Sequence, residues 1–105
     1  MAIMAISVTP IGTASSGVGE YVAEAVQVIE RSGLGYELNA MHTVVEGDLA
    51  ALMALVVQIH TALFARGAHR LSTVVKLDDR RDAPSTIEGK VKSVEQRIAR
   101  RLSAR

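Results

Sequence analysis

Large apolar residues alternate with small or polar residues in two segments, Ala2 to Ile11 and Leu71 to Leu77. A period of two residues is typical of a β-strand that buries one face. In the first segment the large apolar side is formed by Met4, Ile6 and Val8. The sequence therefore predicts two strands, each with one face in the core and one face of mixed character.

The segment from Gly33 to Asp48 is predicted to be a strand pair between two helices. Gly33 is suited to end a helix, and Asp48 is suited to cap the start of the next one. Between them, the sequence predicts strands over Tyr36 to Ala40 and His42 to Glu46. This hairpin is the centre of the predicted fold.

Three segments carry apolar residues at spacings of three and four, which is typical of helices with one buried side. The first two segments end near Ser32 and near Arg66. The third covers about residues 86–103 and begins where Ser85 and Glu88 have the spacing of a capping box. We therefore expect two helices within the strand series and one additional helix at the C-terminus.

The order strand, helix, strand, strand, helix, strand predicts an α+β fold, the ferredoxin-like β-α-β-β-α-β sandwich. A chain of 105 residues suits a single domain over residues 1–105. The second face of the sheet is too apolar in places to be simply solvated; it includes Ala5, Ser7, Thr9, Val74 and Lys76. We expect sheet-to-sheet pairing or the C-terminal helix to cover it, and hence a homo-oligomer.

Composition excludes several classes of function. Without cysteine the chain has no disulfide framework and no thiolate site, which suits a reducing, cytoplasmic location. The apolar N-terminal segment has no basic start and is interrupted at Pro10 and Gly12, so we interpret it as a strand and expect no signal peptide or membrane span. A net charge of +1, with one Phe, two Tyr and no Trp, argues against nucleic acid as a partner.

Few residues suggest catalysis or metal binding. His42, His60 and His69 are far apart, so we expect no metal and no cofactor. His60 lies on the apolar side of its helix and is interpreted as a hydrogen-bonded packing residue. Ser15 and Ser16 are interpreted as helix caps because no base is placed to activate them. An enzyme is therefore the least favoured class.

Two charged features leave alternatives open. Glu46 ends a strand, where its carboxylate can face a cleft or complement the dipole of the helix that begins near Asp48. The run from Asp78 to Asp82 is either a solvated rim or an ion-pair network or anion site between subunits.

Four stretches together resemble a known family: Ser7 to Gly12, Gly33 to Leu38, Met41 to Asp48, and Lys76 to Asp82. In this order and at these separations they are similar to the thiamine-binding (YkoF-like) proteins. The resemblance implies a ferredoxin-like fold, dimers that pair through their sheets, and commonly tetramers. It also implies a non-catalytic protein that binds thiamine or its hydroxymethylpyrimidine part.

The chemistry of that ligand selects candidate residues. A thiazolium cation is best matched by a carboxylate, and an aminopyrimidine edge needs paired donors and acceptors. The candidate ligand-binding residues are Thr9, Ser16, Tyr36, Asn39, Thr43 and Glu46. The alternative is a structural or regulatory oligomer of the same family without this ligand.

Overall fold

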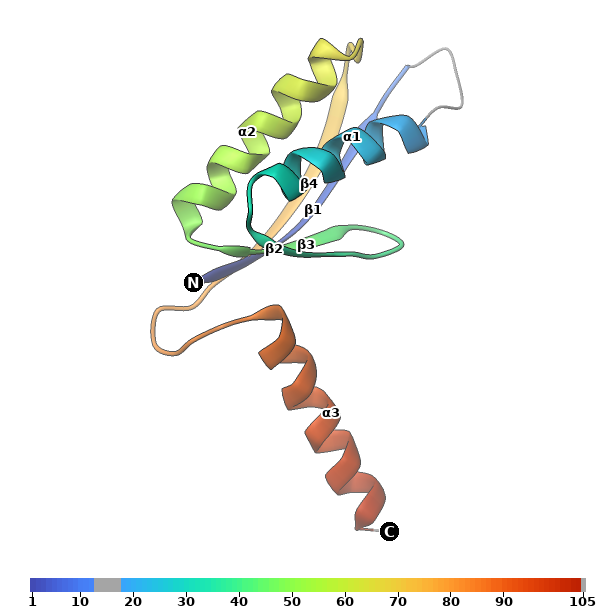
Figure 1. The fold of residues 1–105 in the computed structure, drawn as a ribbon. Helices are drawn as coiled ribbons and strands as arrows, with labels where there is room; N and C mark the ends of the chain where they lie inside the picture. Colours follow the sequence, from blue (N-terminus) through green and yellow to red (C-terminus); the bar gives the residue numbers. More distant parts are fainter. Residues whose placement is uncertain (13–17, 105) are drawn as a thin grey trace.

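The computed structural model describes residues 1–12 and 18–104 and contains three helices and four strands in these ranges (Figure 1). In chain order they are β1 (Ala2–Pro10), α1 (Val18–Arg31), β2 (Gly35–Leu38), β3 (Thr43–Gly47), α2 (Leu49–Ala65), β4 (Leu71–Asp79) and α3 (Ile87–Ser103). The caps predicted at Ser15 and Ser16 lie outside the described residues.

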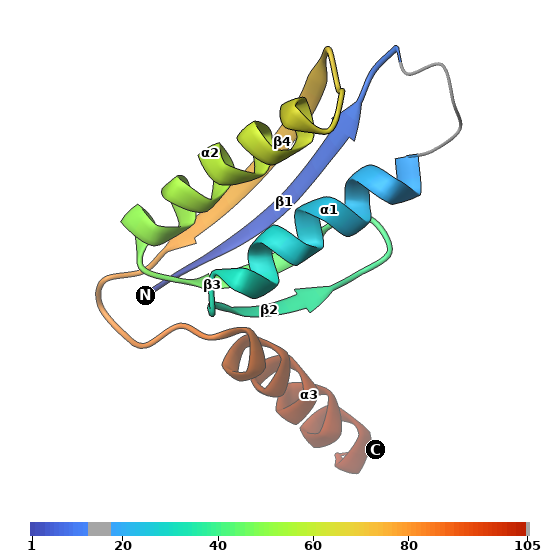
Figure 2. The ribbon, with the colours of Figure 1, turned by 45° about the horizontal axis from the view of Figure 1, so that its top comes forward.

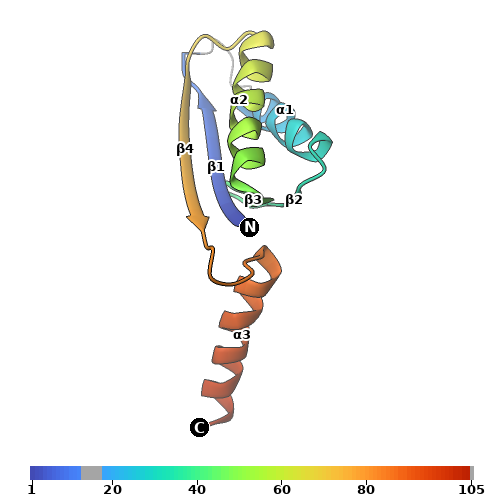
Figure 3. The same ribbon diagram turned by 90° about the vertical axis from the view of Figure 1, so that its left-hand side faces the viewer.

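The four strands form one antiparallel sheet in the order β2-β3-β1-β4. Both α1 and α2 lie on the same side of this sheet (Figure 3). This order, with two helices on one face, confirms the predicted ferredoxin-like fold. The strand β1 lies between β3 and β4 and is paired along both of its edges, so it holds the two halves of the sheet together.

The core fills the space between the sheet and the two helices (Figure 2). It contains the alternate residues of β1 and β3 that the apolar pattern assigned to one face, together with the inner sides of the helices. These buried residues are Ala2, Met4, Ile6, Val28, Ile29, Val45, Leu52, Leu55, Ile59 and Leu63. The core therefore consists of aliphatic side chains and one methionine.

His60 lies at the margin of this core. Its Nε2 atom is 2.6 Å from the hydroxyl oxygen of Thr73 on β4, and its ring stacks on Phe64 with 6.4 Å between the ring centroids. The predicted role of His60 as a hydrogen-bonded packing residue is confirmed.

Several element boundaries differ from the prediction. β2 ends at Leu38 instead of Ala40, because the amide of Asn39 donates to the carbonyl of His42 and closes the hairpin turn. The predicted cap of the third helix at Ser85 is wrong. Thr86 is the N-cap of α3 instead, and its hydroxyl accepts from the amide of Gly89 at 3.0 Å.

α3 extends away from the sheet and places its C-terminal half beyond the body of the protein (Figures 1 and 3). None of its residues is buried. Its apolar side is 49 to 61 % exposed at Val91, Val94, Ile98 and Leu102. Within this chain α3 therefore does not lie along the open face of the sheet.

The packing of α2 predicts which of its side chains stabilises the fold. Leu52 is fully buried, whereas its neighbour Met53 is more than one-third exposed. Leu52→Ala is expected to reduce the free energy of unfolding by about 2–5 kcal/mol, because the surrounding core cannot fill the cavity. Met53→Ala is the matched control and should cost much less. Chemical denaturation measures both values, and equal losses would contradict this core.

Candidate functional site

A pocket forms because the two neighbours of β1 differ in length. β4 is paired with β1 from Ala2 to Pro10, but β3 is paired with it only as far as Ile6, which lies opposite Thr43. In the part of the chain that the structure describes, no strand lies on the β3 side of β1 beyond Ile6. The turn of the β2-β3 hairpin and the helix α1 border the space left there.

This space, the hairpin pocket, has a volume of about 320 Å³. One wall is apolar and comes mainly from α1, and the other carries polar groups from β1 and the hairpin turn. The lining residues are Ile6, Ser7, Val8, Thr9, Val18, Val22, Ala25, Val26, Ile29, Leu38, Asn39, Ala40, Met41, His42, Thr43 and Ile59. A mostly apolar cavity with a few polar groups is typical of a small-molecule site.

Three of the six predicted site residues meet in the hairpin pocket: Thr9, Asn39 and Thr43. Ser16 lies outside the described residues. The pocket also includes Ser7 and His42. Sequence reasoning missed Ser7, although Ser7 shares a face of its strand with the selected Thr9, and it considered His42 as a metal ligand.

Glu46 and Tyr36 lie apart from these three residues, in a groove beside the start of α3 that Glu37 and Ile87 also line. A carboxylate oxygen of Glu46 accepts a hydrogen bond of 2.7 Å from the amide of Ile87. The same side chain passes over Gly35, where an added Cβ would lie 2.8 Å from Oε1 of Glu46. Glu46 therefore complements the first turn of α3, a contact that neither sequence hypothesis for this residue included.

The charged run after β4 forms ion pairs at short range. Arg80 pairs with Asp82 at 2.7 Å, and Arg81 pairs with Asp79. Hydrogen bonds from these guanidinium groups hold the pKa of Asp79 and of Asp82 below the ordinary value of a carboxyl group. Asp78 pairs with Lys90 of α3 and so links the end of β4 to this helix.

The described residues contain neither a cluster of metal ligands nor a helix that could cross a membrane. In residues 1–12 and 18–104, no three His, Asp or Glu side chains are arranged to hold a metal ion. No helix among the described elements has the length and apolar character needed to cross a membrane.

Comparison with known proteins decides the family. A family model described as thiamine-binding protein matches residues 4–95. The chain belongs to the thiamine-binding protein family. The resemblance predicted from four stretches of the sequence is thereby confirmed.

Sequence similarity to relatives covers nearly the whole length of this chain. The UPF0045 protein YqgV of Bacillus subtilis is 38% identical over 102 residues, which are 93% of this chain and 98% of the relative. A UPF0045 protein of Mycobacterium bovis is 42% identical over 98 residues, with 93% and 95% covered.

Solved structures show the same fold. A hypothetical protein from Methanocaldococcus jannaschii has a TM-score of 0.82 and 32% identity, with 90% of this chain and 95% of that one covered. A putative thiamine biosynthesis/salvage protein from Thermotoga maritima has a TM-score of 0.77 and 26% identity, with 89% and 97% covered.

The contact of Glu46 with α3 generates a prediction about this helix. Glu46→Gln keeps an oxygen acceptor for the Ile87 amide but removes the negative charge, so the first turn of α3 should lose about 0.3–1 kcal/mol of stability. Glu46→Ala should cost more, because the amide then loses its acceptor. Hydrogen exchange of the α3 amides measures both effects.

Glu37→Gln is the control for this experiment. Glu37 lies in the same groove, yet among the described residues it has no hydrogen-bond or ion-pair partner. If Glu37→Gln accelerated exchange in α3 as much as Glu46→Gln, a general charge effect would replace the proposed contact.

Proposed function

We propose that this protein binds a small pyrimidine-containing ligand, thiamine or its hydroxymethylpyrimidine part, in the hairpin pocket and catalyses no reaction on it. The observation that carries the proposal is the meeting of Thr9, Asn39 and Thr43 around a cavity of about 320 Å³. Membership of the thiamine-binding protein family supports the class of ligand. The relative from Thermotoga maritima, described as a putative thiamine biosynthesis/salvage protein, supports it as well.

The lining of the pocket suits an aminopyrimidine ring. The side-chain amide of Asn39 offers both a donor and an acceptor, which is what the edge of an aminopyrimidine requires. Thr9 and Thr43 also line the pocket, and a threonine hydroxyl can both donate and accept a hydrogen bond. Aliphatic residues of α1, among them Val22 and Ile29, provide an apolar surface for the face of the ring.

Within one chain the carboxylate of Glu46 does not reach this ring, because it is held at the amide of Ile87. Tyr36 lies in the same groove as Glu46 and not in the hairpin pocket. We therefore propose that the pyrimidine, and not the thiazolium cation, is the part of the ligand that this pocket recognises. Hydroxymethylpyrimidine alone should then bind almost as tightly as thiamine.

A second proposal concerns assembly. If the protein binds no such ligand, this assembly is the basis of the alternative function, a structural or regulatory oligomer. Val74 on the open face of the sheet is 65 % exposed, and the apolar side of α3 is exposed as well. Several neighbouring exposed apolar side chains are typical of an interface. We propose that these surfaces meet in a homo-oligomer in the cytoplasm, in which sheet-paired dimers assemble into a tetramer.

Titration calorimetry tests the ligand proposal. We expect saturable heat with thiamine and with hydroxymethylpyrimidine, and a loss of about tenfold in affinity for both in Asn39→Ala, because two hydrogen bonds are removed. Gln58→Ala removes the same kind of amide from an exposed position on α2 and should change nothing. Glu46→Gln should leave the affinity for hydroxymethylpyrimidine unchanged.

Two results would contradict the ligand proposal. Absence of heat with both compounds at millimolar concentration would exclude these ligands and favour the structural oligomer. A large loss of affinity in Glu46→Gln, with none in Asn39→Ala, would move the site to the groove beside α3.

The assembly proposal is tested at Val74. Val74→Glu would place a carboxylate in a desolvated contact at a cost of several kcal/mol per site, so sedimentation should show smaller species. Val57 on α2 is equally exposed, at 64 %, and lies on the helical side of the protein. Val57→Glu should therefore leave the oligomer intact. An unchanged assembly in Val74→Glu would place the interface elsewhere.

A further inference from the structure

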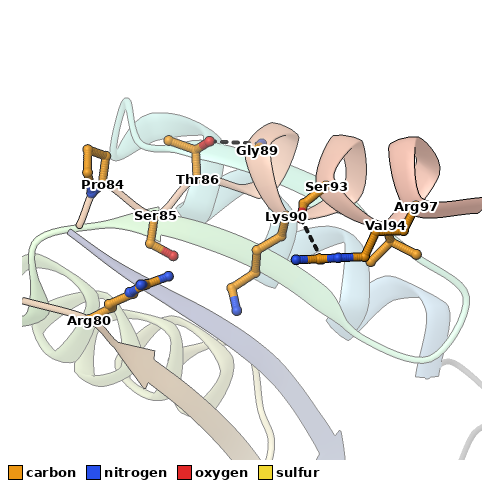
Figure 4. Close-up of a pocket in the computed structure, with 9 residues that line it drawn as sticks. All are labelled: Arg80, Pro84, Ser85, Thr86, Gly89, Lys90, Ser93, Val94 and Arg97. Atoms are coloured by element: carbon orange, nitrogen blue, oxygen red, sulfur yellow. Dashed lines mark hydrogen bonds between the residues drawn. The ribbon is translucent and has the colours of Figure 1, made fainter. Parts of the chain in front are cut away.

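A second cleft, separate from the hairpin pocket, opens between the loop after β4 and the first half of α3. We name it the α3 cleft; its lining residues are Arg80, Pro84, Ser85, Thr86, Gly89, Lys90, Ser93, Val94 and Arg97. Its volume is about 600 Å³, and it shares no residue with the hairpin pocket. Figure 4 shows these residues around one open space.

Three cationic side chains converge on the α3 cleft. Arg80 comes from the loop, while Lys90 and Arg97 come from positions seven residues, or about two helical turns, apart on α3 (Figure 4). The guanidinium group of Arg97 donates a 2.7 Å hydrogen bond to the hydroxyl of Ser93, which directs it back along the helix. Like charges repel, so such a convergence is favourable when an anion lies between them.

Ser85 adds a neutral hydrogen-bond donor to the three cations of the α3 cleft. The residue as a whole is 6 % exposed, but its hydroxyl is not a buried group without a partner, since the described residues contain none. Figure 4 shows this hydroxyl pointing into the cleft, toward the space between Arg80 and Lys90. A hydroxyl that faces the cleft can donate a hydrogen bond to an anion bound there.

The carboxylates nearby neutralise this charge only in part. Arg80 is paired with Asp82, and Lys90 with Asp78, but each cation has further N–H donors that these pairs leave free. Arg97 is paired with no carboxylate among the described residues. An anion in the cleft would therefore contact the guanidinium group of Arg97, which no carboxylate neutralises among the described residues. It could also accept hydrogen bonds from the remaining N–H donors of Arg80 and Lys90.

We propose that the α3 cleft binds a phosphate group, carried by free phosphate or by a small organic phosphate monoester. Guanidinium and ammonium donors together with a hydroxyl form the donor set that recognises phosphate oxygens. Pro84 and Val94 add apolar surface, which suits the organic part of an ester. This site is independent of the ligand proposed for the hairpin pocket.

Calorimetry with inorganic phosphate and with phenyl phosphate tests this proposal on the full chain. We expect saturable binding that weakens about tenfold in Arg97→Gln and less in Ser85→Ala, because a charged donor contributes more than a neutral one. Asp82→Asn should strengthen binding, since it releases the guanidinium of Arg80. Tighter binding of phenyl phosphate than of inorganic phosphate would identify an ester as the preferred ligand, and the reverse would identify free phosphate.

Arg101→Gln is the matched control, because Arg101 carries the same charge on α3 but does not line the cleft. It should leave the affinity unchanged. Equal losses in Arg97→Gln and Arg101→Gln would mean general attraction to a basic helix and would overturn the proposal. Absence of binding by both compounds at millimolar concentration would overturn it too. Circular dichroism of each variant verifies that α3 is still formed.

Discussion

The unequal pairing of the two edges of β1 is the constraint on which the rest of the structure depends. One face of β1 anchors the core through Met4 and Ile6, and the long pairing with β4 keeps the strand extended as far as Pro10. Because β3 ends opposite Ile6, the last residues of β1 border a cavity instead of another strand. Stability and one wall of the hairpin pocket therefore arise from the same strand, while Asn39 and His42 enter the pocket from the hairpin turn.

A second constraint joins three distant parts of the chain. Gly35 leaves room for the side chain of Glu46, and Glu46 holds the amide of Ile87. The ion pair between Asp78 and Lys90 adds a second attachment for the same helix. The start of α3 is thus fixed at the sheet, and the geometry of the α3 cleft follows from this position. The remainder of the helix has no such attachment in the described structure and extends outward.

The sequence was sufficient for those features that depend on periodicity. The core side of β1, the helix end at Gly33 and the packing role of His60 follow from alternation, helical spacing and the chemistry of a buried ring. The sequence was insufficient for contacts between residues that lie far apart along the chain. Nothing in the local pattern joins Glu46 to Ile87, and the length difference between the two neighbours of β1 becomes visible only when the strands are paired.

The apolar side of α3 links these constraints to assembly. A helix of this length without tertiary contacts is only marginally stable in water, and α3 has few contacts beyond its first turns. Complete burial of one Val, Leu or Ile side chain contributes about 1.5–3 kcal/mol, so covering four half-exposed ones would stabilise α3 considerably. The homo-oligomer proposed above would supply such cover from a second copy, whose open sheet face exposes Val74. The phosphate proposed for the α3 cleft would then bind beside an interface, where Val94 belongs to both surfaces.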